Sequence, residues 1–444
     1  MVTAFFFIWL ILALIFAIFN LKVSLGLLIA YLLLVPYSSF KLSYIPIEFN
    51  YVLLAIFCIF LVRVGLLKKE SFDLTFIVPF LIFVIFTLMG SFFSHGLELS
   101  KQLSSLRSFS ISSFLIPIML WQICKEKSDV DFFIRIILFC LTIMCIYGIF
   151  CAITGQNPYI TFLSNLFNKQ NNYQIFSQIE RAGILGKIQS TTSHPMLWSA
   201  ILFLALFALY VFFDTRNNLQ FYILVSLILI NLLICNVRSG IFAFILGMAY
   251  LFTHFSLRLK LFSLSVIVFM LAISIDTSLF GKYQPLVDSM IYFNDPAKSY
   301  GGSSLDMRLL QLDGAISLWE KGGIIFGNGF GWCGYYSAQY GDHPVLLGFE
   351  SILFVMIIEN GIMGIILYGF VYLSFFRINY LVYKKAKIIQ KMEYWIITSY
   401  LISYIIFILV TGMFGFNLFL IFLVIMFLKI LLKNKETSSY AIEK

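Results

Sequence analysis

The chain has 444 residues, of which 61% are hydrophobic and only 11% are charged, and its mean hydropathy is +0.97. A soluble domain is about half apolar and about a quarter charged, so this composition excludes a soluble globular protein and predicts a polytopic membrane protein. The net charge of +9 does not indicate a nucleic-acid partner, because the basic residues cluster in short connections between apolar segments, as in proteins that obey the positive-inside rule.

The apolar segments predict an all-α fold with twelve or thirteen transmembrane helices in one integral membrane domain, residues 1–444. Each helix needs roughly 20 apolar residues to cross the hydrocarbon core of a bilayer. The first segment lacks the basic region of a cleaved signal peptide, so we expect it to be retained. In chain order the candidate spans are 4–19, 22–36, 48–65, 74–93, 108–124, 131–152, 195–213, 219–236, 239–255, 261–277, 350–376, 394–412 and 415–432.

Lysine-rich connections predict the orientation of these spans. Most of the Lys and Arg residues fall in every second connection and in the tail 433–444, which places those segments in the cytoplasm. The alternate connections are then extracytoplasmic, and the two largest of them are the loops 154–194 and 280–347. Thirteen spans would start the chain outside and twelve would start it inside, but neither count moves the two large loops.

The loop 280–347 has predicted structure of its own. Helical spacing of Arg308, Leu312, Ala315 and Trp319 predicts a helix from Leu305 to Trp319 that lies along the membrane surface. The Gly-rich run at 327–331 predicts a tight turn or a small anion-binding nest. It is not a dinucleotide fingerprint, because no strand-and-helix unit surrounds it.

Cysteine and histidine usage predicts neither a disulfide framework nor a metal or other cofactor. Six of the seven Cys residues lie in or beside apolar segments, and Cys333 is alone in the large loop. His95 and His254 have no second ligand at a useful spacing for a metal.

Four cations lie on three segments that are expected to face outward: Arg181 and Lys187 in the loop 154–194, Arg238 at a helix junction, and Arg308 in the loop 280–347. A guanidinium group binds phosphate oxygens bidentately, and few carboxylates lie nearby to neutralise these residues, so we expect an anionic ligand such as a pyrophosphate. Two other interpretations remain open. Arg238 could be a snorkelling side chain at the membrane interface, and the whole set could contact lipid headgroups.

Three titratable residues flank or enter the span that starts at 350. Glu350 is a candidate general base beside an apolar wall, although a carboxylate at a helix N-terminus can simply complement the helix dipole. His343 is a candidate second acid or base, or else a loop histidine without a role. Glu359 lies deeper in the span, where an ionisable group is a functional candidate by default.

The order of these landmarks resembles the O-antigen polymerase and ligase superfamily. Glu350-Ser351, nine residues and then Gly361-Ile362-Met363-Gly364 match the pattern His-[Asn/Ser/Gln]-x9-Gly-x2-[Gly/Thr/Tyr] everywhere except at the first position. The similarity covers roughly residues 181–364. Its other matching elements are the Arg181-Ala182-Gly183 run, the turn from Arg238 to Gly240, Arg308 in the large outer loop, and the Gly327, Gly329 and Gly331 turn.

The resemblance implies a C-type membrane glycosyltransferase in the bacterial inner membrane with its site facing the periplasm. Its donor and acceptor would be glycans linked to undecaprenyl pyrophosphate, with a chain-length regulator as a further partner. Arg238, Arg308, Arg181 and Lys187 would bind the pyrophosphate, while Glu350, Arg308 and His343 would be catalytic. The ligases keep the histidine that Glu350 replaces, so a repeat-unit polymerase is favoured over an O-antigen ligase that transfers glycan to the lipid A core.

A protein of another class, a transporter or flippase of lipid-linked glycans, is the competing hypothesis. Transporters are expected to carry charged and helix-breaking residues near the membrane midplane, often in repeated halves. The chain shows no internal repeat, and Arg135 and Glu359 are the few candidates for such charges.

Overall fold

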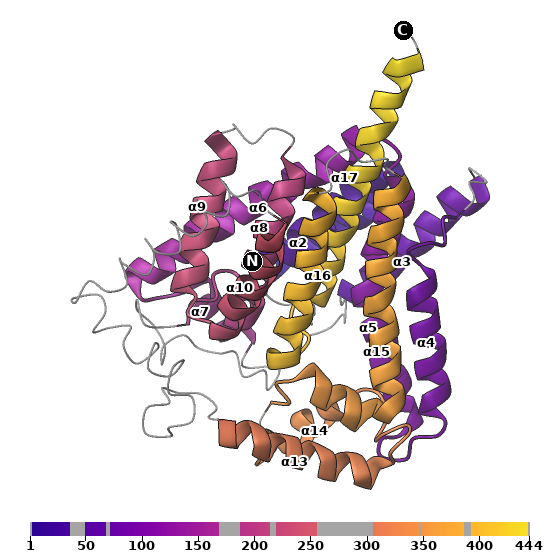
Figure 1. Cartoon of the computed structure of the whole chain (residues 1–444), viewed down its shortest axis with the longest axis vertical. Coiled ribbons are helices and arrows are strands. Elements are labelled where there is room, and N and C mark those ends of the chain that lie inside the picture. The colour runs from indigo at the N-terminus through magenta and orange to yellow at the C-terminus, as the bar shows by residue number, and fades with distance from the viewer. Residues whose placement is uncertain are drawn as a thin grey trace.

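The computed structural model describes residues 2–35, 49–67, 72–167, 187–213, 219–254, 305–346, 348–385 and 392–442 (Figure 1). These segments are α-helices joined by turns and contain no strand, so the predicted all-α class is confirmed for them. In chain order the elements are α1 (Val2–Phe19), α2 (Leu21–Leu34), α3 (Phe49–Leu61) with the π-helical η1 (Val62–Leu67), α4 (Val78–Ser91), α5 (Leu99–Ile123), α6 (Lys127–Thr154), α7 (Pro158–Phe167), α8 (Pro195–Phe212), α9 (Leu219–Ile234), α10 (Arg238–Thr253), α13 (Leu305–Gly322), α14 (Trp332–Tyr340), α15 (Ile352–Lys385), α16 (Met392–Thr411) and α17 (Phe416–Ile442).

Twelve of the thirteen predicted spans coincide with helices in these described ranges, and the remaining one, 261–277, lies outside them. Within the same ranges, six helices are long and apolar enough to cross a membrane: α5, α6, α8, α15, α16 and α17. Six more are apolar but shorter. The protein is therefore an all-α protein embedded in a membrane.

Local sequence signals explain several helix ends. Asn20 caps α2, because its side chain accepts hydrogen bonds from the backbone N–H groups of Lys22 and Val23. Helix α6 begins with a capping box, in which the side chains of Glu126 and Asp129 each accept a hydrogen bond from the backbone N–H of the other residue. Gly155 ends α6 in the left-handed conformation with φ 67°.

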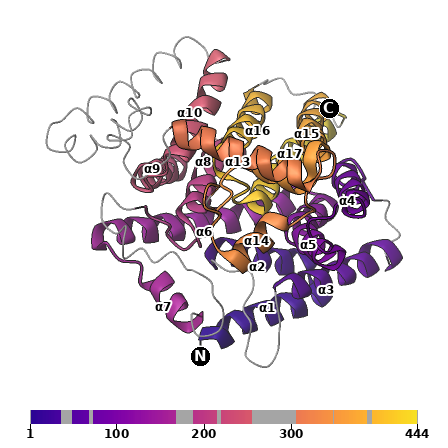
Figure 2. The same ribbon diagram turned by 90° about the horizontal axis from the view of Figure 1, so that it is seen from below.

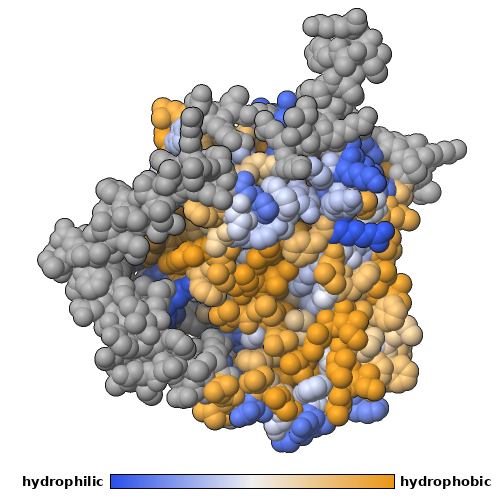
Figure 3. All heavy atoms as spheres, in the orientation of Figure 1, coloured by the Kyte–Doolittle hydropathy of each residue, from blue (hydrophilic) through white to orange (hydrophobic). Residues whose placement is uncertain are grey.

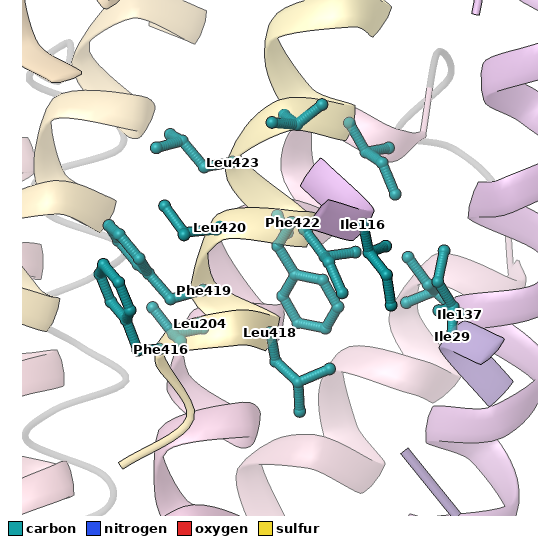
Figure 4. Close-up of a cluster of buried hydrophobic side chains, with 14 of the residues drawn as sticks. Ile29, Ile116, Ile137, Leu204, Phe416, Leu418, Phe419, Leu420, Phe422 and Leu423 are labelled. Carbon is teal, nitrogen blue, oxygen red and sulfur yellow. The ribbon is translucent and has the colours of Figure 1, made fainter. Parts of the chain in front are cut away.

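The apolar half of α17 is the centre of the bundle. Its residues from Leu418 to Leu428 are all buried, as expected for a helix that is hydrophobic on every side. Figure 4 shows Leu418, Phe419, Leu420 and Phe422 among side chains from α2, α5, α6 and α8. Aromatic stacking fixes α17 against α16, with the ring centroids of Tyr404 and Phe419 4.0 Å apart.

The outer surface of the bundle is apolar across its middle. Figure 3 shows hydrophobic residues over most of the central band of one face, with hydrophilic residues above and below it. Large apolar side chains such as Ile153 and Leu373 are exposed. A surface of this kind is unfavourable in water and matches the hydrocarbon core of a bilayer.

The two ends of the bundle differ in charge and in structure. Lys429 lies 2.7 Å from Asp131 and Lys433 lies 3.3 Å from Glu393, so the middle of α17 meets the starts of α6 and α16 at the end of the bundle that is uppermost in Figure 1. Lys22 pairs with Asp129 there, which places the α1–α2 connection at this Lys-rich end. The starts of α2, α6 and α16 therefore lie at the same end of the bundle.

Candidate functional site

The end of the bundle opposite the Lys-rich end is covered by α13 and α14 (Figures 1 and 2). Helix α13 crosses this end, and it confirms the helix predicted from Leu305 to Trp319, extended to Gly322. Its most buried residues are Gln311 and Ala315. Two residues of the predicted line lie on this inner side, since Ala315 is fully buried and Leu312 packs against the same apolar cluster. Trp319 donates its indole N–H to the carbonyl oxygen of Ile324 at 2.8 Å.

Arg308 lies in the first turn of α13, which is the turn on the side of α10 (Figure 2). The structure describes the backbone of this residue but not its side chain. Arg181 and most of the loop 154–194 lie outside the described residues. The described part of the loop 154–194 contains α7, and the loop 280–347 contains α14; neither helix was predicted.

Helix α15 is broken at Gly361, where φ is 58° and ψ is −148°. The backbone of the Gly-rich turn at 327–331, which follows α13, packs into this break. The N–H groups of Asn328 and Gly329 donate to the carbonyl oxygens of Ile358 and Glu359 at 2.8 and 2.7 Å. On the other side of the break, Ile362 and Met363 donate to the carbonyl oxygens of Ile324 and Ile325 at 3.0 and 3.2 Å. The loop therefore supplies the backbone partners that a continuous helix would have provided.

The carboxylate of Glu359 stabilises the same break in α15. We call this break, together with the Gly-rich turn packed into it, the joint. It is buried and accepts hydrogen bonds from the backbone N–H groups of Gly331 at 2.9 Å and Cys333 at 3.0 Å. Gly327, Gly329 and Gly331 all have positive φ, so this is the anion nest that the sequence predicted. Its anion is a carboxylate of the chain itself, and these two N–H groups are not available to an external phosphate.

The two glycines of the 350–364 pattern are required by this geometry. A Cβ atom at Gly361 would lie 2.5 Å from the carbonyl oxygen of Ile324, and one at Gly364 would lie 2.7 Å from the carbonyl oxygen of Met356. Both obstacles are backbone atoms, which cannot rotate away as a side chain can. The spacing that carries the resemblance therefore has a structural reason.

Glu350 lies at the start of the first half of α15, as predicted. Ser351 caps the helix by accepting from the N–H of Leu353 at 3.3 Å, and its hydroxyl donates to the carbonyl oxygen of Leu409 in α16 at 2.7 Å. Gly412, with φ 102°, lies beside the backbone of Glu350, since a Cβ there would be 3.6 Å from the carbonyl oxygen of Glu350. These contacts fix the backbone of Glu350, which is half-buried, against the α16–α17 connection.

His343 supports the turn that leads to Glu350. Its Nδ1 atom accepts hydrogen bonds from the N–H groups of Val345 at 3.2 Å and Leu346 at 3.1 Å, so an acid–base role would fall to Nε2. Partial burial lowers the pKa of His343. This direction favours the neutral ring, which is the form that can accept both bonds.

Arg238 begins α10, and the structure brings it close to Lys187. The thiol of Cys235, in the turn before Arg238, contacts the carbonyl oxygen of Ile188 at 3.2 Å. Since Ile188 follows Lys187 directly, both predicted cations flank one turn. Gly240 then packs against Ser199 of α8, and Gly247 packs against Ser403 of α16.

His194 connects the Arg238 region with the Glu350 region, and sequence reasoning missed it. Its Nδ1 accepts from the N–H of Met196 at 3.1 Å and caps α8, while its ring stacks on Phe414 with centroids 5.0 Å apart. Phe414 belongs to the α16–α17 connection that also borders Glu350. A histidine immediately before Pro195 at a helix start was the available signal.

His194 and Glu350 therefore both border the α16–α17 connection. The turn before Arg238 lies next to the start of α8 instead, because Cys235 contacts the carbonyl oxygens of Ile188 at 3.2 Å and Pro195 at 3.4 Å. In the described ranges no three His, Cys, Asp or Glu side chains are grouped so that they could hold a metal ion. The sequence matches no protein-family model and no curated protein sequence.

Proposed function

We propose that this protein is a membrane glycosyltransferase that polymerises oligosaccharide repeat units linked to undecaprenyl pyrophosphate at the outer face of the bacterial inner membrane. The observation that carries the proposal is the common location of four elements. The turns that bear Lys187 and Arg238, the start of α15 at Glu350, and α13 all lie at the end opposite the Lys429–Asp131 and Lys433–Glu393 pairs. The positive-inside rule makes the Lys-rich end cytoplasmic.

The charges at this end suit glycosyl transfer from a diphosphate. Cleavage of the bond between the sugar and the pyrophosphate leaves negative charge on the leaving group, and fixed cations stabilise that charge as it develops. Arg238 and Arg308, assisted by Lys187 and Arg181, would do this. Glu350 would accept the proton of the attacking sugar hydroxyl or orient that hydroxyl, with His343 as a second acid or base through Nε2.

A polymerase is favoured over a ligase because Glu350 occupies the position at which the ligases have histidine. A gene deletion separates the two activities. Loss of a polymerase leaves a single repeat unit on the surface lipid, whereas loss of a ligase leaves no attached glycan at all.

The test uses the deletion strain complemented with variants at equal membrane expression, followed by electrophoresis of the surface polysaccharide. We expect Glu350→Gln and Arg238→Ala to collapse the ladder to one repeat. Glu320→Gln and Arg135→Ala are matched controls, because both are exposed charged residues to which the proposed reaction assigns no role, and we expect them to keep the full ladder. A normal ladder in both site variants would remove these residues from the reaction.

Purified protein in lipid nanodiscs tests the activity itself and separates it from transport. The substrate is the lipid-linked repeat unit extracted from the deletion strain. Polymer formed in nanodiscs, which have no enclosed compartment, would exclude the flippase hypothesis as the explanation. If the purified native protein forms no polymer from this substrate, the proposal is contradicted.

A further inference from the structure

Helix α14 carries a row of aromatic side chains that the mechanism above does not use. Trp332, Tyr336 and Tyr340 are four residues apart and share one face of the helix. Their ring centroids are 5.1 Å apart in each successive pair, with interplanar angles of 31° and 47°. We call Trp332, Tyr336 and Tyr340 the aromatic ledge.

The aromatic ledge is continuous with the candidate site. The ring of Phe349 lies 5.9 Å from Tyr336 and 6.2 Å from Trp332, in edge-to-face geometry. His343 lies 5.4 Å from Tyr336 and 5.9 Å from Phe349. Phe349 directly precedes Glu350, so the row of rings runs from the proposed general base to the far end of α14.

The ledge is accessible at its outer end and has polar groups beside it. Tyr340 is 66% exposed, whereas Trp332 and Tyr336 are half-buried and pack on one side against the small apolar cluster that contains Cys333 and Phe349. Gln339 and Asp342 are exposed next to Tyr340, and Tyr335 of the same helix accepts a hydrogen bond from Lys101 at 3.0 Å. A Cβ at Gly334 or Gly341 would meet no described atom within 4 Å, so space also surrounds both ends of the helix.

A membrane interface would be an alternative environment for Trp and Tyr, which form belts at the headgroup level. Such belts lie on the perimeter of a membrane protein, where side chains reach the lipid. Figures 1 and 2 show α14 beneath the ends of the bundle helices, beside α13, rather than at the rim. The position of the ledge therefore favours a ligand in the aqueous phase below the site.

We propose that the aromatic ledge binds the glycan chain of the acceptor and guides its reactive end to Glu350. Sugar rings have apolar C–H faces that stack on aromatic rings, and their hydroxyl groups need the hydrogen-bonding partners found beside the ledge. Rings spaced along a helix match a chain of sugars better than a single small molecule. This inference rests on the proposed function for the identity of the glycan, but the binding it describes can be measured without polymerisation.

The experiment measures binding of lipid-free oligosaccharides to the full-length protein in nanodiscs by titration calorimetry. The probe is the surface polysaccharide of the source strain, hydrolysed and separated into fragments of one repeat and of several repeats. We expect longer fragments to bind more tightly, and we expect Tyr340→Ala to raise their Kd about five- to tenfold, the contribution of one aromatic stack. Tyr340→Phe should retain the affinity, and Gln339→Ala is the matched exposed control.

Because Tyr340 is largely exposed, its replacement should not affect folding, and a second substitution, Tyr336→Leu, tests the inner part of the ledge. Absence of fragment binding to the native protein, or unchanged binding by both variants, would overturn the inference. The fluorescence of Trp332 is the part of the signal that Trp332→Phe removes, because the chain has six Trp residues. Quenching of that part by spin-labelled lipid, with no protection by the fragments, would identify a membrane belt and would also overturn the inference.

Glu350→Gln distinguishes this inference from the proposed function. We expect this variant to lose polymerisation and to keep fragment binding. If the variant still polymerises while Tyr340→Ala loses fragment binding, the ledge stands and the assigned catalytic base is wrong. If polymerisation depends on Glu350 but no fragment binds the ledge, the proposed function stands and the ledge has no glycan role.

Discussion

Glu359 offers the sharpest test of how the outer end of the protein is held together. Its carboxylate accepts from the backbone of Gly331 and Cys333 at 2.9 and 3.0 Å, and its backbone carbonyl accepts from Gly329. In Glu359→Gln one carboxylate oxygen becomes an N–H₂ group, which must face one of the two backbone N–H donors. One charge-assisted bond is then lost and one buried N–H is left without an acceptor.

The expected magnitude follows from these two losses. A hydrogen bond to a charged group contributes about 1.5–3 kcal/mol, and an unsatisfied buried donor costs about 1–3 kcal/mol. Removing a carboxylate from an apolar interior works in the opposite direction, because it relieves the cost of burying charge. Both oxygens of Glu359 are used, so we expect the losses to exceed the relief, with a net destabilisation of the joint of about 3 kcal/mol, or roughly 100-fold in its opening equilibrium.

Hydrogen exchange with mass spectrometry on protein in nanodiscs measures this opening. Amides of Gly331 and Cys333 should exchange roughly 100-fold faster in Glu359→Gln, while amides in the core of α17 should not change. Glu320→Gln, an exposed carboxylate of α13, is the matched control. Equal or slower exchange at Gly331 and Cys333 in the Gln variant would refute the assignment of Glu359 as the anion of this nest.

Three further predictions follow from the same end of the protein. Gly361→Ala should destabilise the protein by about 1–3 kcal/mol or more and lower its thermal midpoint, because the φ of 58° is strained for alanine and the new Cβ meets backbone atoms. The control is Gly369→Ala, where a Cβ meets nothing within 4 Å, and it should not lower the thermal midpoint. Arg238→Lys should lose most of the glycan ladder that Arg238→Ala loses, because an ammonium group cannot replace bidentate binding, and a full ladder in Arg238→Lys would indicate that charge alone is needed. The turn at His343 should open more readily as pH falls below about 6.5, since burial lowers the pKa of His343 and the protonated ring cannot accept hydrogen bonds from Val345 and Leu346. Hydrogen exchange at the amides of Val345 and Leu346 should therefore become faster at low pH. In His343→Asn, which keeps an acceptor without titrating, exchange at these amides should not show this acceleration.

Spans were predictable from the sequence because each apolar run must be about as long as the bilayer is thick. Their ends were less predictable. Helix α5 begins at Leu99, nine residues before its predicted start, because Leu99 to Arg107 is polar enough to be invisible to a search for apolar segments. For the same reason α15 continues to Lys385, beyond its predicted end at 376.

The joint in α15 was not predictable from local sequence. Glycine is common in membrane-spanning helices, so Gly361 alone does not signal a break. The break becomes stable only because Gly329, Gly331 and Cys333, some thirty residues earlier, place their N–H groups on Glu359. The sequence identified Glu359 as an ionisable group deep in the span. Its partners are backbone N–H groups, however, and these cannot be predicted from the residue types alone.

The spacing in the 350–364 pattern sets the length of the first half of α15. Nine residues, Ile352 to Asn360, separate the Glu350-Ser351 pair from Gly361, and they form the half-helix between the site and the joint. Both ends of this half-helix are fixed, by Ser351 on α16 and by the Gly-rich turn at Gly361. One residue more or fewer would rotate Glu350 by about 100° and move it by about 1.5 Å relative to the joint. The spacing therefore fixes the direction in which the chain presents Glu350.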